Sequence, residues 1–216
     1  MRLTESFYAR DTRQVARELL GTYLVRVLDG LPLAVRICET EAYIGRMDKA
    51  CHAYNYRRTR RNETLFSAPG TAYIYLVYGL HHCLNFVTEA AGEPAAVLIR
   101  GGQARAGLPL LCRGRYGKGP ESLTPYQRAN LLNGPGKLCA ALGLTRQEDG
   151  CSLLGPSLFV CTELSDIGLA APEEDRSPFT VRAGPRIGID YAEEAKDFPW
   201  RFRLETERLA PEGTAP

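Results

Sequence analysis

The feature that most constrains the fold is a pair of β-rich segments separated by only two residues. Residues 22–28 and 31–38 are rich in aliphatic and β-branched side chains, and Asp29-Gly30 stands between them. The Asp-Gly dipeptide readily adopts the left-handed backbone of a tight hairpin turn. The sequence therefore predicts an antiparallel hairpin near the N-terminus, over residues 22–38.

Further strands are expected along the rest of the chain. Residues 70–79 and 83–88 predict a second hairpin, with its tip at or near residues 78–82. Residues 95–100 predict another strand, and residues 200–204 alternate as an amphipathic strand. A last strand is expected within residues 152–161.

Helices are expected where capping signals occur. Asp11 and Gly21 are suited to begin and end a helix over residues 12–20. Thr124 followed by Pro125 is typical of another helix start. Residues 101–119 contain six glycines and predict a loop.

The length and composition favour one globular domain. The chain has 216 residues, of which 44% are hydrophobic and 24% charged, as in ordinary globular proteins. Neither an apolar run of about 20 residues nor a signal peptide is visible, so we expect no membrane association and an intracellular location. We expect one domain over residues 1–209 and a disordered tail over residues 210–216, because the tail is rich in proline and glycine.

The cysteines and histidines argue against a structural metal site. The seven cysteines are dispersed and form no C-x-x-C pair, which predicts reduced thiols. The local clusters Cys51-His52 and His81-His82-Cys83 lack zinc-finger spacing. A metal-dependent hydrolase built on these five residues remains an alternative hypothesis.

The segment Glu39-Thr40-Glu41-Ala42-Tyr43 is the strongest candidate for chemistry. If the preceding strand continues, Glu39, Glu41 and Tyr43 share one face of it. Carboxylates are rarely buried in strands without a partner. A solvated strand end or a salt bridge to nearby arginines is the simpler interpretation of these residues.

The positive charge is concentrated in a few segments. Residues 1–62 contain 12 basic and 7 acidic side chains, although the net charge of the whole chain is only +2. Residues 54–62 interleave tyrosines with Arg57, Arg58, Arg60 and Arg61, a composition suited to a phosphate backbone with bases nearby. Lys137 follows a Gly-Pro-Gly turn at the expected start of a short helix, where free backbone amides suit a phosphate. For residues 54–62, the alternative interpretation is a solvated basic loop without a ligand.

A carboxylate, several tyrosines, a histidine and a basic surface together suit one type of reaction. A carboxylate can deprotonate and orient water, and it can stabilise an oxocarbenium-like transition state at an acetal-like carbon. The sequence contains neither a G-x-S-x-G nor a G-x-G-x-x-G motif.

These motifs resemble those of one known family. The E-T-E-A-Y stretch at 39–43, the segment around His52 and G-T-A-Y-I-Y-L-V-Y-G at 70–79 closely resemble the alkyladenine (3-methyladenine) DNA glycosylases of the mammalian type. Arg61-Asn62, Asn85, Arg100, G-P-G-K-L-C-A-A-L at 134–142 and R-I-G-I from 186 fit the same family. The resemblance extends from about Phe7 to Leu204, with a poorer match over residues 101–130.

The resemblance implies a mixed α/β (α+β) fold, with a curved antiparallel sheet and surrounding helices. It also implies roles for individual residues. Glu41 would be the catalytic carboxylate, and Arg100 would help to hold the attacking water. The base pocket would be formed by Tyr43, His52, Tyr75 and Asn85. Tyr78 would insert into the minor groove of the DNA and fill the gap left by a flipped base.

The implied activity is hydrolysis of the N-glycosidic bond of alkylated or deaminated purines in double-stranded DNA. No lysine lies near Glu41 in the motif, so a monofunctional enzyme without Schiff-base lyase chemistry is expected. Neither a metal nor an organic cofactor is needed, and a monomer is expected. A relative that binds nucleic acid without cleaving it is the remaining alternative.

Overall fold

The 14-residue strand β2 (Leu31–Ile44) organises the structure, a computed structural model that describes residues 1–206. One edge of β2 pairs with β5 (Ala95–Ala106). The other edge pairs with β1 (Tyr23–Leu28) through its first half and with β8 (Arg201–Thr206) through its second half. The hairpin predicted around Asp29-Gly30 is confirmed by the β1–β2 pairing, in which Leu28 lies opposite Leu31.

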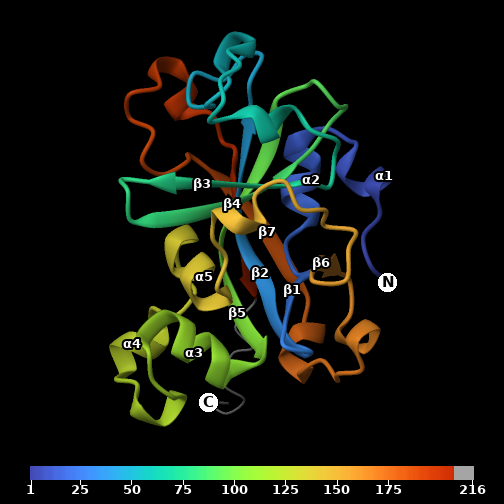
Figure 1. The fold of residues 1–216 in the computed structure, drawn as a ribbon, viewed down its shortest axis with the longest axis vertical. Helices are drawn as coiled ribbons and strands as arrows, with labels where there is room; N and C mark the ends of the chain where they lie inside the picture. Colours follow the sequence, from blue (N-terminus) through green and yellow to red (C-terminus); the bar gives the residue numbers. More distant parts are fainter. Residues whose placement is uncertain (207–216) are drawn as a thin grey trace, which may run out of the picture.

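The sheet is antiparallel throughout and runs in the order β3-β4-β5-β2-β1-β6 (Figure 1). The β7 strand pairs with β8, which in turn pairs with β2. The strands not yet defined are β3 (Ala72–Val77), β4 (His81–Val87), β6 (Leu158–Cys161) and β7 (Phe179–Gly184). The β2–β5 ladder contains register shifts, which bend strands and increase their twist. The predicted mixed α/β fold with one curled antiparallel sheet is therefore confirmed.

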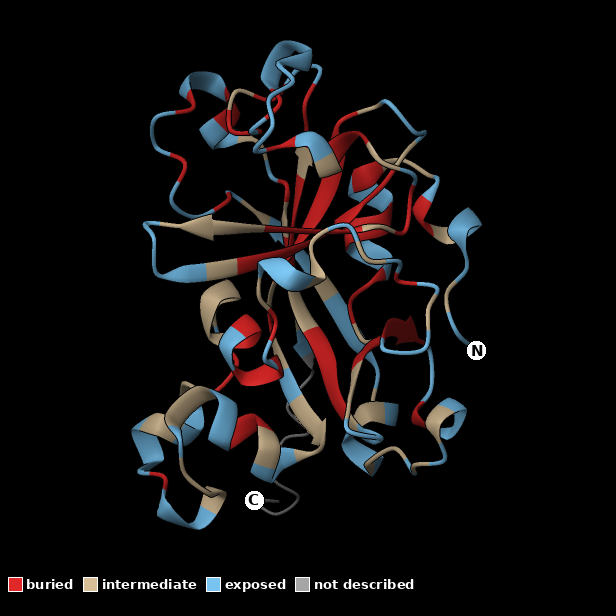
Figure 2. Cartoon of the chain, in the orientation of Figure 1, coloured by how far each residue is buried: buried red, intermediate tan, exposed pale blue. Residues whose placement is uncertain are grey.

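Short helices surround the sheet and bury its apolar faces. They are α1 (Glu5–Tyr8), α2 (Thr12–Glu18), α3 (Leu108–Tyr116), α4 (Pro125–Ala129) and α5 (Pro135–Leu142). Both predicted caps are confirmed, because the Asp11 carboxylate accepts from the amides of the first turn of α2 and Thr124 forms a capping box on α4. The main core lies where α2 and α5 meet the centre of the sheet (Figure 2).

The prediction of a loop over residues 101–119 is wrong. β5 continues through Gly101-Gly102 to Ala106, and α3 follows it. The glycines mark close approaches of backbone. A Cβ on Gly102 would overlap the carbonyl oxygen of Arg36, and one on Gly114 would lie 2.7 Å from the carbonyl oxygen of Ala141 in α5. Glycine is the residue that permits such contacts.

Other boundaries differ from those predicted. β2 extends beyond Cys38 to Ile44, and β6 is confined to four residues within the expected range 152–161. All seven cysteines are free thiols, as predicted. Within residues 1–206, no helix combines the length and the apolarity that crossing a membrane requires. The predicted tail at residues 210–216 lies outside the described residues.

Candidate active site

The second half of β2 carries Glu41 into the interior of the protein. Its side chain is fully buried, although it is a carboxylate. The Tyr43 hydroxyl donates a hydrogen bond to Oε2 at 2.7 Å, and the backbone amide of Ile187 donates to Oε1 at 2.8 Å. Nη1 of Arg100 lies 3.5 Å from Oε2. The interpretation of this stretch as a solvated strand end is therefore wrong for Glu41.

Glu39 lies on the same face and holds the arginine that faces Glu41. Its Oε1 accepts from Nε of Arg100 at 3.1 Å and from Nε of Arg201 at 2.5 Å. Arg201 comes from β8, which pairs with this part of β2. Glu39 thus fixes the Arg100 guanidinium between two carboxylates, and it forms the salt bridge that the simpler interpretation predicted. The expected shared face of Glu39, Glu41 and Tyr43 is confirmed by these contacts.

Burial and neighbouring charges act on Glu41 in opposite directions. Burial raises the pKa of Glu41, whereas the Arg100 charge and the hydrogen bonds from Tyr43 and Ile187 lower it, and the net pKa lies above the usual value. A carboxylate with a raised pKa is a better proton acceptor at neutral pH than an exposed one. Burial disfavours the charge of Arg100, but Glu41 and Glu39 raise its pKa, so the guanidinium stays charged.

An aromatic pocket lies next to Glu41 through Tyr43, which lines the pocket and donates its hydroxyl to the carboxylate. The rings of Tyr73 and Tyr75 are 5.4 Å apart between centroids, and His52 meets Tyr75 edge-on at 4.5 Å. Burial raises the pKa of both Tyr43 and Tyr75 well above the usual value, so these phenols remain neutral. The lining residues are Tyr43, Ala50, Cys51, His52, Leu65, Tyr73, Tyr75, Asn85 and Ala96. The structure thus brings together the four residues predicted to form the base pocket.

Hydrogen bonds fix the polar groups of the pocket. Nδ1 of His52 lies 3.1 Å from the Tyr73 hydroxyl. Desolvation of the ring, together with the charge of Arg61, lowers the pKa of His52, so the imidazole is neutral near pH 7. The Asn85 amide donates to the carbonyl oxygens of Tyr73 and Cys83, at 3.0 and 3.2 Å. A neutral imidazole in this setting can present an N–H or a lone pair to a planar ligand.

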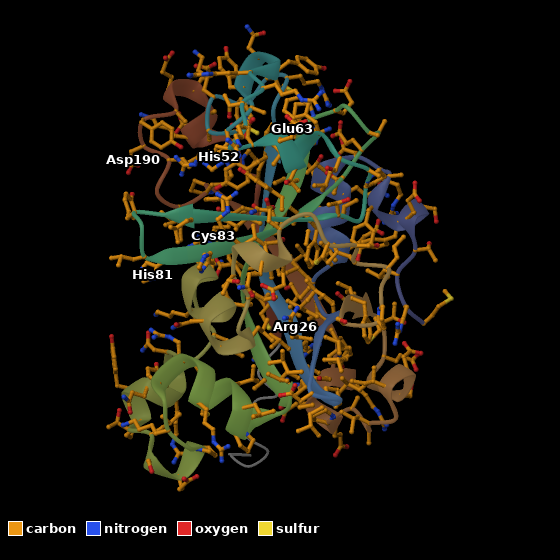
Figure 3. All side chains as sticks on the ribbon, viewed as in Figure 1. Arg26, His52, Glu63, His81, Cys83 and Asp190 are labelled. Carbon is orange, nitrogen blue, oxygen red and sulfur yellow. The ribbon has the colours of Figure 1, made fainter. Side chains whose placement is uncertain are left out.

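The pocket opens into a wider cleft beside the β3–β4 hairpin. The cleft is bordered by Arg61, Arg100 and Pro135 and by the segment from Ile187 to Tyr191. Tyr78 stands at the hairpin tip with 91% of its surface exposed, as expected for a side chain that inserts into a partner. Figure 3 shows His52, Cys83 and Asp190 on the side of the molecule toward which this hairpin projects.

Four predicted backbone-contact arginines lie on one loop and are exposed. Arg58 forms a salt bridge with Glu63, with 3.0 Å between Nε and Oε2, so its charge is partly offset. Arg61 donates to the carbonyl oxygen of Leu76 at 3.1 Å, at the border of the cleft. Across residues 1–206, no salt bridge of Arg57, Arg60 or Arg61 is found.

Lys137 is separate from these arginines and lies in the first turn of α5. Its Nζ donates to the amide oxygens of Asn130 and Asn133, both at 2.8 Å, so its charge meets neutral acceptors. Together with His81 and Tyr78 it lines a groove that adjoins the cleft and shares Tyr78 and Pro135 with it. The structure therefore places Lys137 near the hairpin tip but outside the aromatic pocket.

The residues of the metal-hydrolase alternative do not converge. Cys51 and His52 line the pocket, whereas His81 and His82 are successive residues of β4 and point to opposite faces. In the part of the chain that the structure describes, no three His, Cys, Asp or Glu side chains are grouped as metal ligands would be.

Several residues of the site were not identified from the sequence. The amide of Ile187 holds Glu41, but a backbone donor leaves no side-chain signal. Arg201 reaches Glu39 only because β8 pairs with β2. Tyr73 offered a signal, because it is two residues from Tyr75 and therefore shares its face.

A family model and similar proteins both relate this chain to one family of DNA glycosylases. The family model described as methylpurine-DNA glycosylase matches residues 6–208. A protein of Clostridium perfringens (strain SM101) with the provisional name 3-methyladenine DNA glycosylase is 46% identical over 209 residues, which cover 97% of this chain and 98% of that protein. A protein of Desulfitobacterium hafniense with the same provisional name is 45% identical, over 94% of this chain and 95% of its own length.

A third relative, from Bacillus thuringiensis, carries this provisional name as well and is 47% identical, over 95% of this chain and 96% of its own length. These relatives are bacterial, so they support the family predicted from the sequence but not the narrower mammalian type. With a family model that spans nearly the whole chain and relatives this similar over their full lengths, the chain belongs to the methylpurine-DNA glycosylase family.

Proposed function

We propose that this protein is a base-excision-repair DNA glycosylase. It would hydrolyse the N-glycosidic bond of alkylated or deaminated purines in double-stranded DNA and leave an abasic site. One observation carries the proposal: the buried Glu41 carboxylate and the Arg100 guanidinium lie 3.5 Å apart beside an aromatic pocket.

The damaged nucleotide must leave the duplex to reach this pocket. Rotation out of the base stack costs a few kcal/mol. Insertion of an aromatic wedge offsets part of that cost, as in other proteins that bind the minor groove. Tyr78 suits this role because it is almost fully exposed at the tip of a hairpin beside the cleft.

In the proposed reaction, Glu41 activates a water molecule that attacks C1′ of the flipped nucleotide. The proton moves from the water to Glu41, the C1′–N bond breaks, and the purine leaves with the bonding electron pair. The raised pKa of Glu41 makes it a suitable proton acceptor, and the negative charge stabilises the oxocarbenium-like sugar. Arg100 would help to hold the water, because Glu39 fixes its guanidinium next to Glu41.

The pocket favours electron-poor purines. Tyr43 and Tyr75 are neutral aromatic rings on which a base can stack, and cationic rings such as those of 3-methyladenine or 7-methylguanine gain most from the ring quadrupole. His52 can donate an N–H to an acceptor of hypoxanthine or ethenoadenine. Asn85, held by its own hairpin, would discriminate against a guanine amino group.

We expect a monofunctional enzyme that works as a monomer inside the cell, with the DNA, and without a metal or an organic cofactor. Water is the proposed nucleophile, because among residues 1–206 no lysine lines the aromatic pocket or the cleft that Arg100 borders. Schiff-base chemistry would require such a lysine.

The experiment is incubation of the protein with duplexes that carry one hypoxanthine or ethenoadenine, or with methylated DNA, followed by hot alkali. Strand breaks that depend on alkali would support a monofunctional glycosylase, whereas breaks before alkali would indicate lyase activity. Complete absence of breaks with all three substrates would show that the proposal is wrong and favour a relative that only binds. A parallel reaction in EDTA tests the metal-hydrolase alternative, which predicts loss of activity.

A further inference from the structure

A second buried ion pair lies directly behind the aromatic pocket. The side chains of Arg186 and Asp48 are both 0% exposed, and their nitrogen and oxygen atoms meet at 2.5 and 2.8 Å. Arg186 also donates to the backbone carbonyl oxygens of Ala42, at 2.8 Å, and Ala195, at 3.1 Å. The planar guanidinium of Arg186 thus donates four hydrogen bonds. A lysine ammonium cannot reproduce this arrangement of donors.

This guanidinium contacts the Tyr43 ring of the pocket and the backbone next to Glu41. Its central carbon lies 4.6 Å from the centre of the Tyr43 ring and 5.2 Å from that of Trp200. The carbonyl group that it holds belongs to Ala42, the residue between Glu41 and Tyr43. Ile187, which follows Arg186 in the chain, supplies the backbone amide that donates to Glu41.

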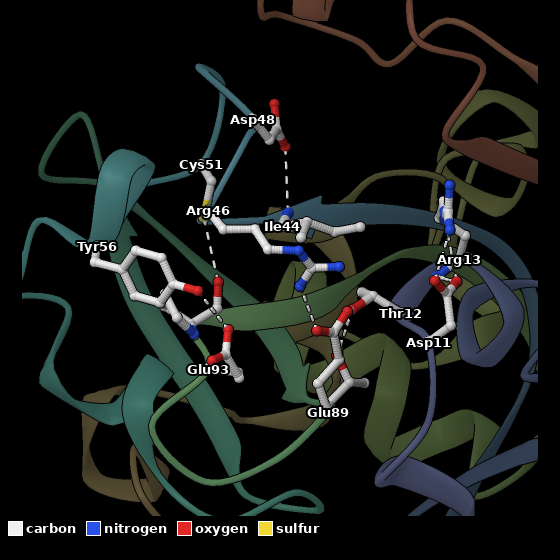
Figure 4. Close-up of polar contacts among 12 residues, drawn as sticks. Asp11, Thr12, Arg13, Ile44, Arg46, Asp48, Cys51, Tyr56, Glu89 and Glu93 are labelled. Atoms are coloured by element: carbon white, nitrogen blue, oxygen red, sulfur yellow. Dashed lines mark hydrogen bonds and ion pairs between the residues drawn. The ribbon is translucent and has the colours of Figure 1, made fainter.

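Asp48 anchors the guanidinium to the end of β2. Its carboxylate accepts from the backbone amides of Ala50, at 2.9 Å, and Ile44, at 3.4 Å; the second contact is drawn in Figure 4. The chain segment that contains Arg186 and Ile187 is therefore tied to β2 itself. The Arg186–Asp48 pair is thus one of the links that hold the Ile187 amide at the Glu41 carboxylate.

A buried ion pair is a weak means of stabilisation, because desolvation of two charges offsets most of their attraction. Specific geometry is the better-supported reason for such a pair when it borders a functional site. Here the fixed geometry includes the face of a pocket tyrosine and a hydrogen bond to the proposed general base.

We propose that Arg186, held by Asp48, is a positioning residue that orients Glu41 and Tyr43 together. This inference rests on the proposed function, because it assigns to Arg186 an effect on base release. Arg186 would act through its neighbours and would not touch the substrate. A misplacement of about 1 Å at a catalytic group can cost about 100-fold in rate.

The test compares Arg186→Lys and Asp48→Asn with a matched control, Arg36→Lys. Arg36 forms another buried pair with Asp175, with side chains 2% and 1% exposed and 2.9 Å between Nη1 and Oδ1. It also lies against an aromatic ring, Phe179, at 5.6 Å, but it is in the first half of β2, away from the pocket. Asp175 keeps Arg105 as a second partner in this control.

Single-turnover release of hypoxanthine, lesion-DNA affinity and thermal unfolding are measured for each variant. We expect Arg186→Lys and Asp48→Asn to slow release by about 100-fold, with a much smaller change in DNA affinity. We expect Arg36→Lys to lower the unfolding temperature and to leave the release rate within about threefold of the wild type.

The pH profile separates positioning from general loss of stability. The titratable and charged groups that face Glu41 are Glu39, Tyr43, Tyr75, Cys83, Arg100 and Arg186. The Ile187 amide lowers the pKa of Glu41, so its displacement in Arg186→Lys raises that pKa. The acidic limb of the rate profile should therefore move to higher pH in this variant and stay in place in Arg36→Lys.

Three results would overturn the inference while the wild type remains active. One is release at the wild-type rate by both Arg186→Lys and Asp48→Asn. Another is an equal loss of rate in Arg36→Lys. The third is unfolding of both test variants while Arg36→Lys folds, which would make the pair a purely structural element. An inactive wild-type protein would instead refute the proposed function and this inference with it.

Discussion

Glu41 is a carboxylate whose buried position is disfavoured by desolvation and favoured by three donors. Tyr43, Ile187 and Arg100 each offer it a hydrogen or a positive charge, at 2.7, 2.8 and 3.5 Å. Glu39 lies two residues away but accepts only from the arginines. The two acids therefore differ in their partners, although their side chains are the same.

We expect Glu41→Gln to bind lesion DNA as the wild type does and to release the base at a rate lower by a factor of about 10² to 10⁴, because the proton acceptor is lost. Single-turnover kinetics and gel-shift titration measure the two properties. Glu39→Gln is the matched control and should lose much less, since it only loosens Arg100. An equal loss in Glu39→Gln would transfer the proposed role away from Glu41.

The pH dependence of base release should show Glu41 directly. Burial raises its pKa above the usual glutamate value, so the carboxylate is protonated, and unable to accept a proton, up to a higher pH than an exposed glutamate. The release rate should therefore rise with pH along a limb whose midpoint exceeds the usual glutamate pKa, and then level off. Single-turnover rates on hypoxanthine DNA between about pH 4 and 8 test this.

The β3–β4 hairpin is the element that brings Tyr78 to the surface beside the cleft. Tyr78 has a positive φ of 51°, and the following Gly79 has a φ of 70°. A bulky residue with positive φ is strained by about 1 kcal/mol or more, whereas asparagine tolerates this region. The strained backbone and the nearly full exposure of the ring both fit a residue retained for contact with a partner.

Tyr78→Asn is expected to leave the free energy of unfolding unchanged or raised, by about 1 kcal/mol at most, because the turn is relieved of strain. The same change should weaken binding to lesion DNA and slow base release, because the wedge is lost. Urea denaturation and gel-shift titration measure these effects. A large loss of stability would mean that the ring supports the hairpin itself.

The β2–β5 pairing depends on a glycine that sequence patterns assigned to a loop. A Cβ on Gly102 would overlap the Arg36 carbonyl oxygen and approach Val35, both in β2. Gly102→Ala should therefore lower the free energy of unfolding by about 1–3 kcal/mol, through overpacking. Gly184→Ala in β7 is the control, because a Cβ there has open space and the expected change is small. Equal urea midpoints for the two variants would contradict this account.

At the scale of the whole molecule, the basic residues predicted to contact the DNA backbone lie on two separate elements. The exposed loop carries Arg57, Arg60 and Arg61, and α5 carries Lys137. The charge of Lys137 is held by neutral amide oxygens, so it stays available to a phosphate. Phosphate contacts fix the position of a protein on DNA without reading its sequence.

Replacement of Arg60 by Gln should weaken binding to any duplex and make the slope of log affinity against log salt shallower by about 0.9, if it contacts one phosphate. Arg58→Gln should have a smaller effect, because Glu63 already offsets that charge. Arg182 of β7, an exposed arginine outside the cleft lining, provides the control through Arg182→Gln. Titrations at several salt concentrations measure the slopes, and identical slopes for Arg60→Gln and Arg182→Gln would exclude the contact.

Local sequence patterns determined the β1–β2 hairpin and the caps of α2 and α4. They also determined that Glu39, Glu41 and Tyr43 share one face of a strand. Each of these features depends only on neighbours in the chain. The resemblance of several separated motifs to one family predicted the pocket residues. Patterns failed over residues 101–119, because a glycine that permits a close backbone contact looks the same as a glycine in a loop.

Only the tertiary structure decided what surrounds Glu41. The sequence by itself placed two carboxylates and a tyrosine on one strand face, and it favoured a solvated end. The Ile187 amide, the Arg201–Glu39 contact and the Arg186–Asp48 pair join residues separated by 146, 162 and 138 positions. Local periodicity holds no information about such contacts, because they arise when β8 and the segment before it fold back onto β2.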